Sequence, residues 1–242
     1  MRSDPLIITG KGGSGTRVLA FVLQALGYDF GKKLNEAAEH PRLAKLLNGS
    51  DFLFRALKGD TEGAAAQLRL ALNEIDIPAD GRWGIKLPML SVTVPVLRLV
   101  VPDFQMILVV RDGRDMLSAA QNKRRDAIMK AAGLPAGPPN ATFWSWCNLK
   151  ALDDLGRSGS RARKGAKLYV SRYESLCLDP FEEIRRVLHL IDLDCTKLEI
   201  EAAARLVKPS EGMMRWKDYP ERVKRARSVL EPAMGRLGYQ WS

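Results

Sequence analysis

The chain has 242 residues, of which 46% are hydrophobic, and its 38 Lys and Arg against 28 Asp and Glu give a net charge of +10. This hydrophobic fraction is enough to bury a full core, so the composition excludes a disordered chain and suits one α/β domain spanning residues 1–242. The positive charge indicates an anionic partner, and charge alone leaves open a nucleotide, a nucleic acid, an anionic glycan or a membrane surface.

The cysteines and the apolar runs exclude further classes of protein. The three cysteines, Cys147, Cys177 and Cys195, are odd in number and lack CxxC spacing, which predicts reduced thiols. No metal site is expected, because the two histidines lie far from any paired cysteines. The apolar run of residues 92–110 is broken by two prolines and two charged residues, so no transmembrane segment is expected. We therefore expect a cytoplasmic protein without a signal peptide.

The first predicted strand, residues 6–9, runs directly into a glycine-rich turn and then into a helical pattern over residues 17–26. The turn has the sequence Gly10-Lys11-Gly12-Gly13-Ser14-Gly15-Thr16-Arg17. A strand that ends in glycines and opens a helix leaves backbone N–H groups unpaired at the positive end of the helix dipole. The turn therefore predicts an anion-binding site, to which two hydroxyl and two basic side chains would contribute.

Strands and helical patterns alternate along the rest of the chain. Three further apolar runs predict strands at residues 83–87, 106–110 and 168–171. Helical patterns are predicted at residues 64–72, 92–101 and 144–155, with a last helix capped by Asp179 and begun by Pro180. The glycine-rich segments 133–139 and 156–165 predict loops. This alternation predicts an α/β fold with a central parallel sheet flanked by helices, and ligands at the carboxyl ends of its strands.

The glycine turn departs from the P-loop of nucleoside triphosphatases. That motif places a lysine directly after its last glycine to bridge the terminal phosphates, whereas Gly15 is followed by Thr16 and Arg17. The Lys-Gly-Gly start also resembles the deviant motif of partition ATPases. This chain lacks the second lysine of that motif and has Thr16 in its place. A P-loop nucleotide phosphotransferase or ATPase is kept as the catalytic alternative. A basic nucleic-acid-binding protein is the non-enzymatic alternative, and no nucleic acid partner is expected.

Four blocks of sequence together indicate a different nucleotide chemistry. They are residues 13–19 (GSGTRVL), 107–118 (ILVVRDGRDMLS), 169–180 (YVSRYESLCLDP) and 212–217 (GMMRWK). In this order they resemble the 5′-phosphosulfate loop, the 3′-phosphate block, a late-strand signature and the closing loop of sulfotransferases that use 3′-phosphoadenosine 5′-phosphosulfate (PAPS). The ending at residues 236–239 (RLGY) is similar to that of bacterial members. Matching is weak over residues 35–82.

The resemblance implies a P-loop-like fold and a PAPS site. It implies that the 5′-phosphosulfate lies on the turn, against Lys11, Gly12, Gly13, Ser14, Gly15, Thr16 and Arg17. It assigns the 3′-phosphate to Arg111 and to Ser118, which would share a helix face with Arg114 if a helix starts near Gly113. Tyr173 would lie against the nucleotide, with Glu174 bracing the turn. The closing loop would contribute Arg215, Trp216 and Lys217.

Two positions depart from the family pattern. The basic residue that normally precedes Ser-Gly-Thr is replaced by Gly13, so Lys11 or Arg17 must supply its charge. The usual serine of the 3′-phosphate block falls at Ala119, and Ser118 comes one step earlier. Gln121 and Asn122 are the possible substitutes.

The resemblance implies transfer of a sulfuryl group to a hydroxyl of a carbohydrate or small-molecule acceptor, with release of adenosine 3′,5′-bisphosphate (PAP). Lys11 is the first candidate for stabilising the leaving oxygen. Lys86 is the second, and the alternative for it is a solvated lysine at a strand end. The histidine that acts as base in part of the family is absent here. The candidate bases are Glu36, Glu39 and His40, and an ordinary loop histidine is the alternative for His40.

Overall fold

The computed structural model describes residues 4–76, 81–119, 122–156 and 166–241. Within them, a parallel sheet has the strand order β2-β1-β3-β4. Its strands are β1 (Leu6–Thr9), β2 (Gly84–Lys86), β3 (Gln105–Val110) and β4 (Lys167–Arg172). Each lies within two residues of its predicted position. The predicted parallel sheet is confirmed, with all three pairings parallel and Ile8 of β1 opposite both Lys86 and Ile107.

One face of the sheet packs against α1 (Thr16–Ala25), α8 (Tyr173–Leu178), α9 (Pro180–Leu190) and α10 (Lys197–Ala204). Leu6 and Ile8 of β1 point to this face because side chains alternate along a strand. They share a buried cluster with Leu19 of α1 and Ile184 of α9. As predicted, Asp179 caps α9, accepting a hydrogen bond from the Glu182 N–H, and Pro180 begins the helix. This packing fixes α1 directly behind the turn that follows β1.

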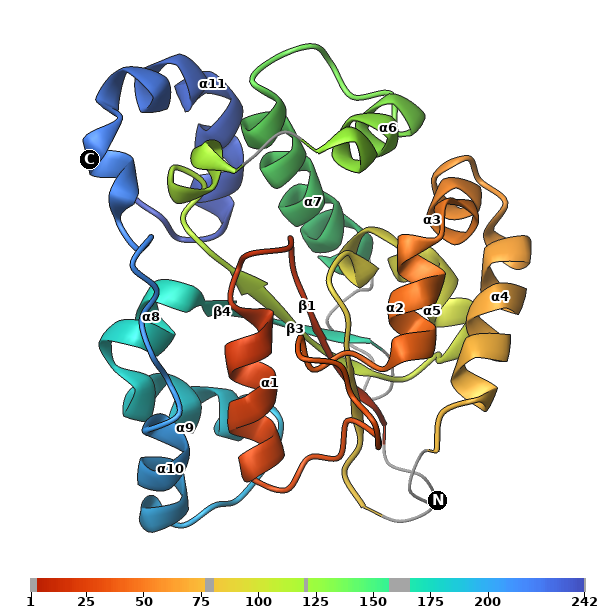
Figure 1. The fold of residues 1–242 in the computed structure, drawn as a ribbon. Coiled ribbons are helices and arrows are strands. Elements are labelled where there is room, and N and C mark those ends of the chain that lie inside the picture. The colour runs from red at the N-terminus through yellow and green to blue at the C-terminus, as the bar shows by residue number, and fades with distance from the viewer. Residues whose placement is uncertain (1–3, 77–80, 120–121, 157–165, 242) are drawn as a thin grey trace.

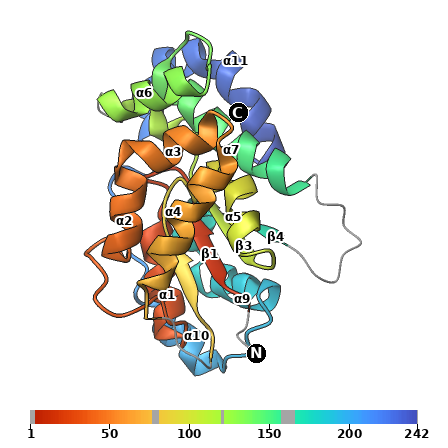
Figure 2. The same ribbon diagram turned by 90° about the vertical axis from the view of Figure 1, so that its right-hand side faces the viewer.

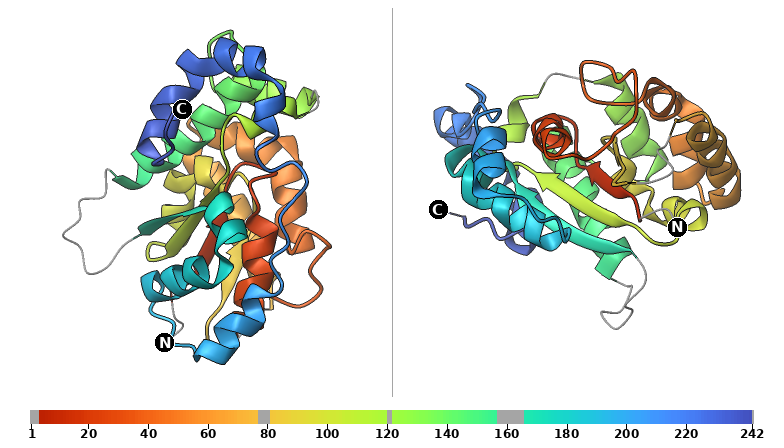
Figure 3. Two further views of the ribbon diagram at one scale, coloured as in Figure 1. Left: turned by 90° about the vertical axis from the view of Figure 1, so that its left-hand side faces the viewer. Right: turned by 90° about the horizontal axis from the view of Figure 1, so that it is seen from below.

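The opposite face is covered by helices that lie between α1 and β4 in the chain. Ile7 points into this layer and shares a buried cluster with Leu68 and Leu97. Its helices are α2 (Pro41–Asn48), α3 (Ser50–Leu57), α4 (Thr61–Asn73), α5 (Val94–Val100) and α7 (Pro139–Gly156). Figure 2 shows α2, α3 and α4 side by side, and Figure 3 shows helices on both sides of the sheet. The weakly matching residues 35–82 thus supply three packed helices.

A third cluster joins the end of β3 to the C-terminal helix. Leu108 and Val110 pack with Trp144 of α7 and Leu230 of α11 (Pro220–Arg236). Trp144 is fully buried, as expected of a packing residue, and its indole N–H donates to the Arg111 carbonyl at 3.0 Å. The carboxyl end of β3 is therefore held from two sides by helices.

The structure corrects the predicted helix boundaries in two places. The expected helix over residues 92–101 is a 3₁₀ turn at Leu90–Val92 followed by α5. After β3, the α-helix expected near Gly113 does not form, and a 3₁₀ turn, η2 (Asp115–Ser118), takes its place. The Asp112 carboxylate accepts the Arg114 N–H at 2.9 Å, and the backbone becomes extended at Ala119. The loop predicted at residues 133–139 ends where α7 begins, and residues 157–165 of the other predicted loop lie outside the described residues.

Candidate functional site

The turn after β1 adopts a conformation that only glycine allows at Gly15. Gly13 and Gly15 have φ angles of +89° and +92°, in the left-handed region that favours glycine. A Cβ atom on Gly15 would also lie 2.3 Å from the ring of Tyr173. The residue opens α1, so its conformation sets the direction in which the turn presents its N–H groups. Gly15 is therefore required both by its backbone and by its neighbour.

The turn leaves an unusual number of donors open. The Ser14 N–H donates to the Lys11 carbonyl at 3.1 Å. The turn N–H groups without an acceptor in the described part of the chain include those of Gly12, Gly13, Gly15, Thr16 and Arg17. The Ser14 hydroxyl is buried and also has no partner there. A buried hydroxyl without a partner is costly, and open N–H groups at the start of a helix attract negative charge, so this pattern indicates a cradle for an anion.

Lys11 is a buried cation at the edge of this cradle. Its residue is 8% exposed, and no described acidic side chain pairs with its ammonium. Burial, helped by the nearby charges of Arg125 and Arg111, lowers the pKa of Lys11 from 10.5 to about 8. An anion placed on the turn would stabilise the charged form.

Lys86 lies at the carboxyl end of β2, next to β1, and it is not a solvated lysine. Its side chain is buried, and its ammonium donates to Glu39 Oε1 and to the Ala37 carbonyl, both at 2.7 Å. Burial lowers the pKa of Lys86, while the Glu39 carboxylate opposes this shift and the charge of Arg17 adds to it. The structure thus brings Lys86 and Glu39 together beside the turn.

The other two candidate bases are placed differently. Glu36 is exposed. His40 caps α2, and its Nδ1 accepts the Arg42 N–H at 3.3 Å. A neutral imidazole whose Nδ1 accepts a hydrogen bond carries its proton on Nε2, so neither nitrogen is free to take a second proton. Burial also lowers the pKa of His40.

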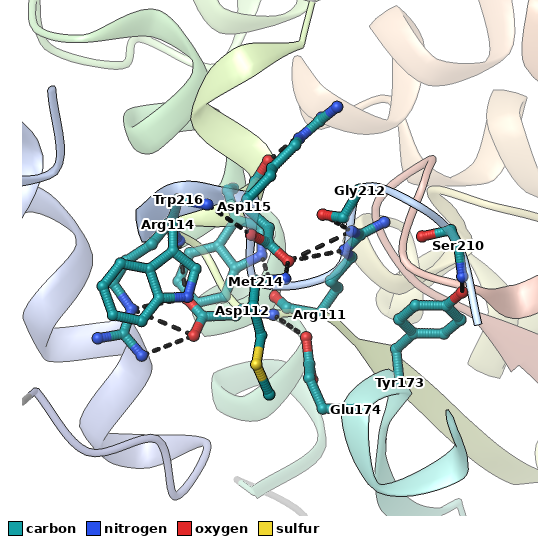
Figure 4. A network of polar contacts seen from close by, with 12 residues as sticks. Arg111, Asp112, Arg114, Asp115, Tyr173, Glu174, Ser210, Gly212, Met214 and Trp216 are labelled. Atoms are coloured by element: carbon teal, nitrogen blue, oxygen red, sulfur yellow. Dashed lines mark hydrogen bonds and ion pairs between the residues drawn. The ribbon is translucent and has the colours of Figure 1, made fainter. Parts of the chain in front are cut away.

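Arg111 forms the centre of a second polar cluster at the carboxyl end of β3, the strand next to β1 (Figure 4). Its Nη2 donates to Asp115 Oδ2 at 3.2 Å and to the Gly212 carbonyl. The guanidinium carbon lies 5.1 Å from the centre of the Tyr173 ring. Arg111 is therefore held in place by a carboxylate, a carbonyl and an aromatic face, with its Nη1 unpaired among the described residues.

Asp115 ties the late loop to this cluster, a role that the sequence analysis missed. Its carboxylate is buried and accepts the N–H groups of Met214 at 2.9 Å and Trp216 at 3.1 Å, besides pairing with Arg111. The Ser210 N–H in turn donates to the Tyr173 hydroxyl at 3.0 Å. The only signal in the sequence is the place of Asp115 four residues after Arg111, which is the spacing of a local ion pair.

The three predicted residues of the closing loop differ in exposure. The 3₁₀ turn η3 (Arg215–Asp218) carries Arg215 and Lys217, which are exposed, and Trp216, whose ring centre lies 3.9 Å from the Arg114 guanidinium carbon. Arg114 itself is buried and paired with Asp112 at 2.7 Å.

The predicted placing of Arg114 and Ser118 on one helix face is wrong. Ser118 ends η2, and in a 3₁₀ turn residues three apart, not four, share a face, so Arg114 and Ser118 do not. Of its two proposed substitutes, Asn122 caps α6 (Lys123–Ala131), and Gln121 lies outside the described residues.

Glu174 braces the turn after β3, as the sequence analysis predicted. Its carboxylate accepts the Asp112 N–H at 2.9 Å and the Tyr239 hydroxyl at 2.7 Å. Burial raises the pKa of Glu174. In the described residues, no group of three acidic, histidine or cysteine side chains is placed to hold a metal ion. The same residues contain no helix that is long and apolar enough to span a membrane.

Comparison with known proteins gives one kind of match. No family model and no curated protein sequence matches the chain. Among solved structures, the sulfotransferase STF9 from Mycobacterium avium aligns with a TM-score of 0.64 and 16% identity, covering 98% of this chain and 78% of that chain. The sulfotransferase domain from the curacin biosynthetic pathway aligns with a TM-score of 0.55 and 14% identity over the full length of both chains. The chain has the sulfotransferase fold.

A third sulfotransferase structure contains a nucleotide. Mouse sulfotransferase SULT7A1, complexed with PAP, aligns with a TM-score of 0.52 and 14% identity, covering 97% of this chain and 86% of that chain. The fold that the sequence blocks predicted is thus confirmed. In this sulfotransferase fold the glycine turn and the Arg111 cluster follow neighbouring strands, β1 and β3.

Proposed function

We propose that this chain is a sulfotransferase that transfers the sulfuryl group of PAPS to a hydroxyl of a carbohydrate or small-molecule acceptor and releases PAP. One observation carries the proposal: a glycine turn with open N–H groups and the polar cluster around Arg111 follow adjacent strands of a sulfotransferase fold. Two separate anion sites fit a nucleotide that bears phosphate at both its 5′ and 3′ positions.

The donor groups suit such a ligand. The open N–H groups of the turn, the unpartnered Ser14 hydroxyl and the Lys11 ammonium would hold the 5′-phosphosulfate. The Nη1 group of Arg111 and the loop of residues 210–218 would hold the 3′-phosphate, since a guanidinium matches the geometry of phosphate oxygens. The nucleotide supplies the sulfuryl group, and this chain's own residues supply the groups that bind and orient it.

Lys11 and Lys86 are the groups proposed to act on the transferring sulfuryl group. A new bond forms between sulfur and the acceptor oxygen while the bond between sulfur and the phosphate oxygen of PAP breaks. Negative charge grows on that leaving oxygen, and a cation fixed beside it lowers the barrier. Lys11 is itself a residue of the turn, and the ammonium of Lys86 is fixed by Glu39 and the Ala37 carbonyl.

We assign the role of general base to Glu39, whose carboxylate would accept the proton of the acceptor hydroxyl. Of the three predicted bases, Glu39 is the one that contacts Lys86 at the strand ends. Glu36 is exposed, and His40 already uses Nδ1 as a helix cap. A base has to lie within hydrogen-bond reach of the acceptor, and Glu39 best meets that requirement.

The proposal is tested by incubating the chain with PAPS labelled in its sulfuryl group and a panel of sugars, phenols and alcohols. We expect a labelled product, equimolar PAP and no requirement for a divalent metal. Lys11→Ala should lower turnover about 100-fold or more with a smaller change in KM, because its interaction strengthens in the transition state. Lys197→Ala, an exposed lysine on α10, is the matched control and should leave turnover unchanged. If Lys11→Ala changes KM alone, Lys11 is a binding residue.

A further inference from the structure

A pocket of about 260 Å³ opens beside the glycine turn. Lys11 and Gly12 form one wall, and α6 and α7 form the opposite walls. Helix α6 packs against α3 and α7 (Figures 1 and 2). Because Lys11 borders both the anion cradle and this pocket, a molecule in the pocket lies next to the group that we propose to be transferred.

The pocket has basic and apolar walls and no acidic lining residue among those described. Its charged residues are Lys11, Arg124 and Arg125. Arg125 is neutralised from outside the pocket, pairing with Asp126 at 2.7 Å and donating to Asn140. Lys11 and Arg124 have no such acidic partner in the described residues. The pocket therefore holds uncompensated positive charge.

Arg124 keeps part of its guanidinium open. Its Nη1 donates to Asn48 of α2, and its other nitrogens have no acceptor in the described part of the chain. Next to it, Asn122 uses its Oδ1 to cap α6, accepting the N–H groups of Arg124 and Arg125 at 3.0 and 3.2 Å. The Asn122 amide nitrogen is thus a second donor at this wall. Between these polar groups, Pro88, Ile128 and Phe143 give an apolar surface for a carbon skeleton.

We infer that this pocket binds the acceptor and that the acceptor carries an anionic group, a carboxylate being the simplest, which Arg124 recognises. The inference rests on the proposed function, because that function places the transferred group at Lys11. A half-buried arginine and a buried lysine in one pocket repel each other unless an anion joins them, and this cost favours acidic over neutral ligands.

Two pairs of probe compounds test the inference: 4-hydroxyphenylacetate with its neutral amide, and glucuronate with glucose. Each is titrated by calorimetry into chain saturated with PAP, so the readout is binding rather than turnover. In at least one pair, we expect the carboxylate to bind about tenfold tighter than its neutral partner, the size of one charge-assisted hydrogen bond. Arg124→Gln should reduce this preference to about twofold or less. Lys123→Gln, an exposed lysine of α6 outside the pocket, should preserve it.

Three results would overturn the inference: equal or better binding of the neutral partners, no detectable binding of either carboxylate, or a carboxylate preference that survives in Arg124→Gln. The proposed function fails in a different way. If the chain does not take up PAP, that function is contradicted, and the same titrations into the free chain still measure the preference of the pocket.

Discussion

Lys11 shows most clearly how one residue links folding to the proposed chemistry. The fold buries an ammonium without an acidic partner among the described residues, which lowers its pKa to about 8. An anionic ligand bound next to this ammonium would stabilise its charged form and so offset the unfavourable free energy of burying it. The stability of the empty protein should therefore depend on the protonation of this residue.

We predict the direction of this dependence. The folded pKa of Lys11 is about 8, below the 10.5 of an ordinary lysine, so between these values the unfolded chain binds the extra proton. The contribution of Lys11 to stability is least favourable below pH 8 and improves as the pH rises through this window, by at most about 3 kcal/mol. In urea unfolding, the free energy of unfolding of the parent chain should gain this contribution between pH 7 and pH 10. The Lys11→Met variant should lack it. An identical pH dependence in both proteins would contradict the buried, charged Lys11.

Among the secondary-structure elements, the loop of residues 210–218 receives two of its backbone contacts from one carboxylate, that of Asp115. Asp115 accepts two loop N–H groups and pairs with Arg111. Asp115→Asn removes the charge and one acceptor oxygen, so we expect faster amide hydrogen exchange in this loop and PAP affinity lowered by about 1.5 to 3 kcal/mol. Asp153→Asn, which alters an exposed pair with Arg236, serves as the control. Unchanged exchange in the loop of Asp115→Asn would refute the role of this carboxylate.

The glycine turn makes a second prediction at this scale. Gly15 and Gly27 both have a φ angle of +92°, but a Cβ atom meets the Tyr173 ring only at Gly15, and at Gly27 it meets nothing within 4 Å. Gly27→Ala should cost about 1 kcal/mol of unfolding free energy, from backbone strain alone. Gly15→Ala adds a steric clash and should cost about 3 kcal/mol or more. Equal losses in the two variants, measured by denaturant unfolding, would mean that Tyr173 does not pack as described.

The sequence predicted the elements that depend on local patterns. The strands and the glycine turn have clear signatures in consecutive residues, and their positions are confirmed. The missed contacts join distant residues: Lys86 and Glu39 are 47 positions apart, and Asp115 and Met214 are 99 apart. The expected helix face shared by Arg114 and Ser118 does not form, because the chain after Asp112, whose carboxylate accepts the Arg114 N–H, continues as a 3₁₀ turn.

For the whole molecule, the order of the sheet brings the two proposed anion sites together. Because β1 and β3 are parallel neighbours, the glycine turn and Arg111 follow their strands at the same edge of the sheet. Helices on both faces hold that edge in place, with α1 behind the turn and α11 behind the Arg111 cluster. The positive pocket at Lys11 adds a third site, so donor and acceptor would meet at one lysine.

The central claim is that this edge binds a nucleotide phosphorylated at its 3′ and 5′ positions. Calorimetric titration of the purified chain with PAP, and separately with ATP and magnesium, tests it most directly. We expect micromolar binding of PAP that is the same with and without magnesium, and much weaker binding of ATP. Tight binding of magnesium–ATP with no measurable affinity for PAP would contradict it.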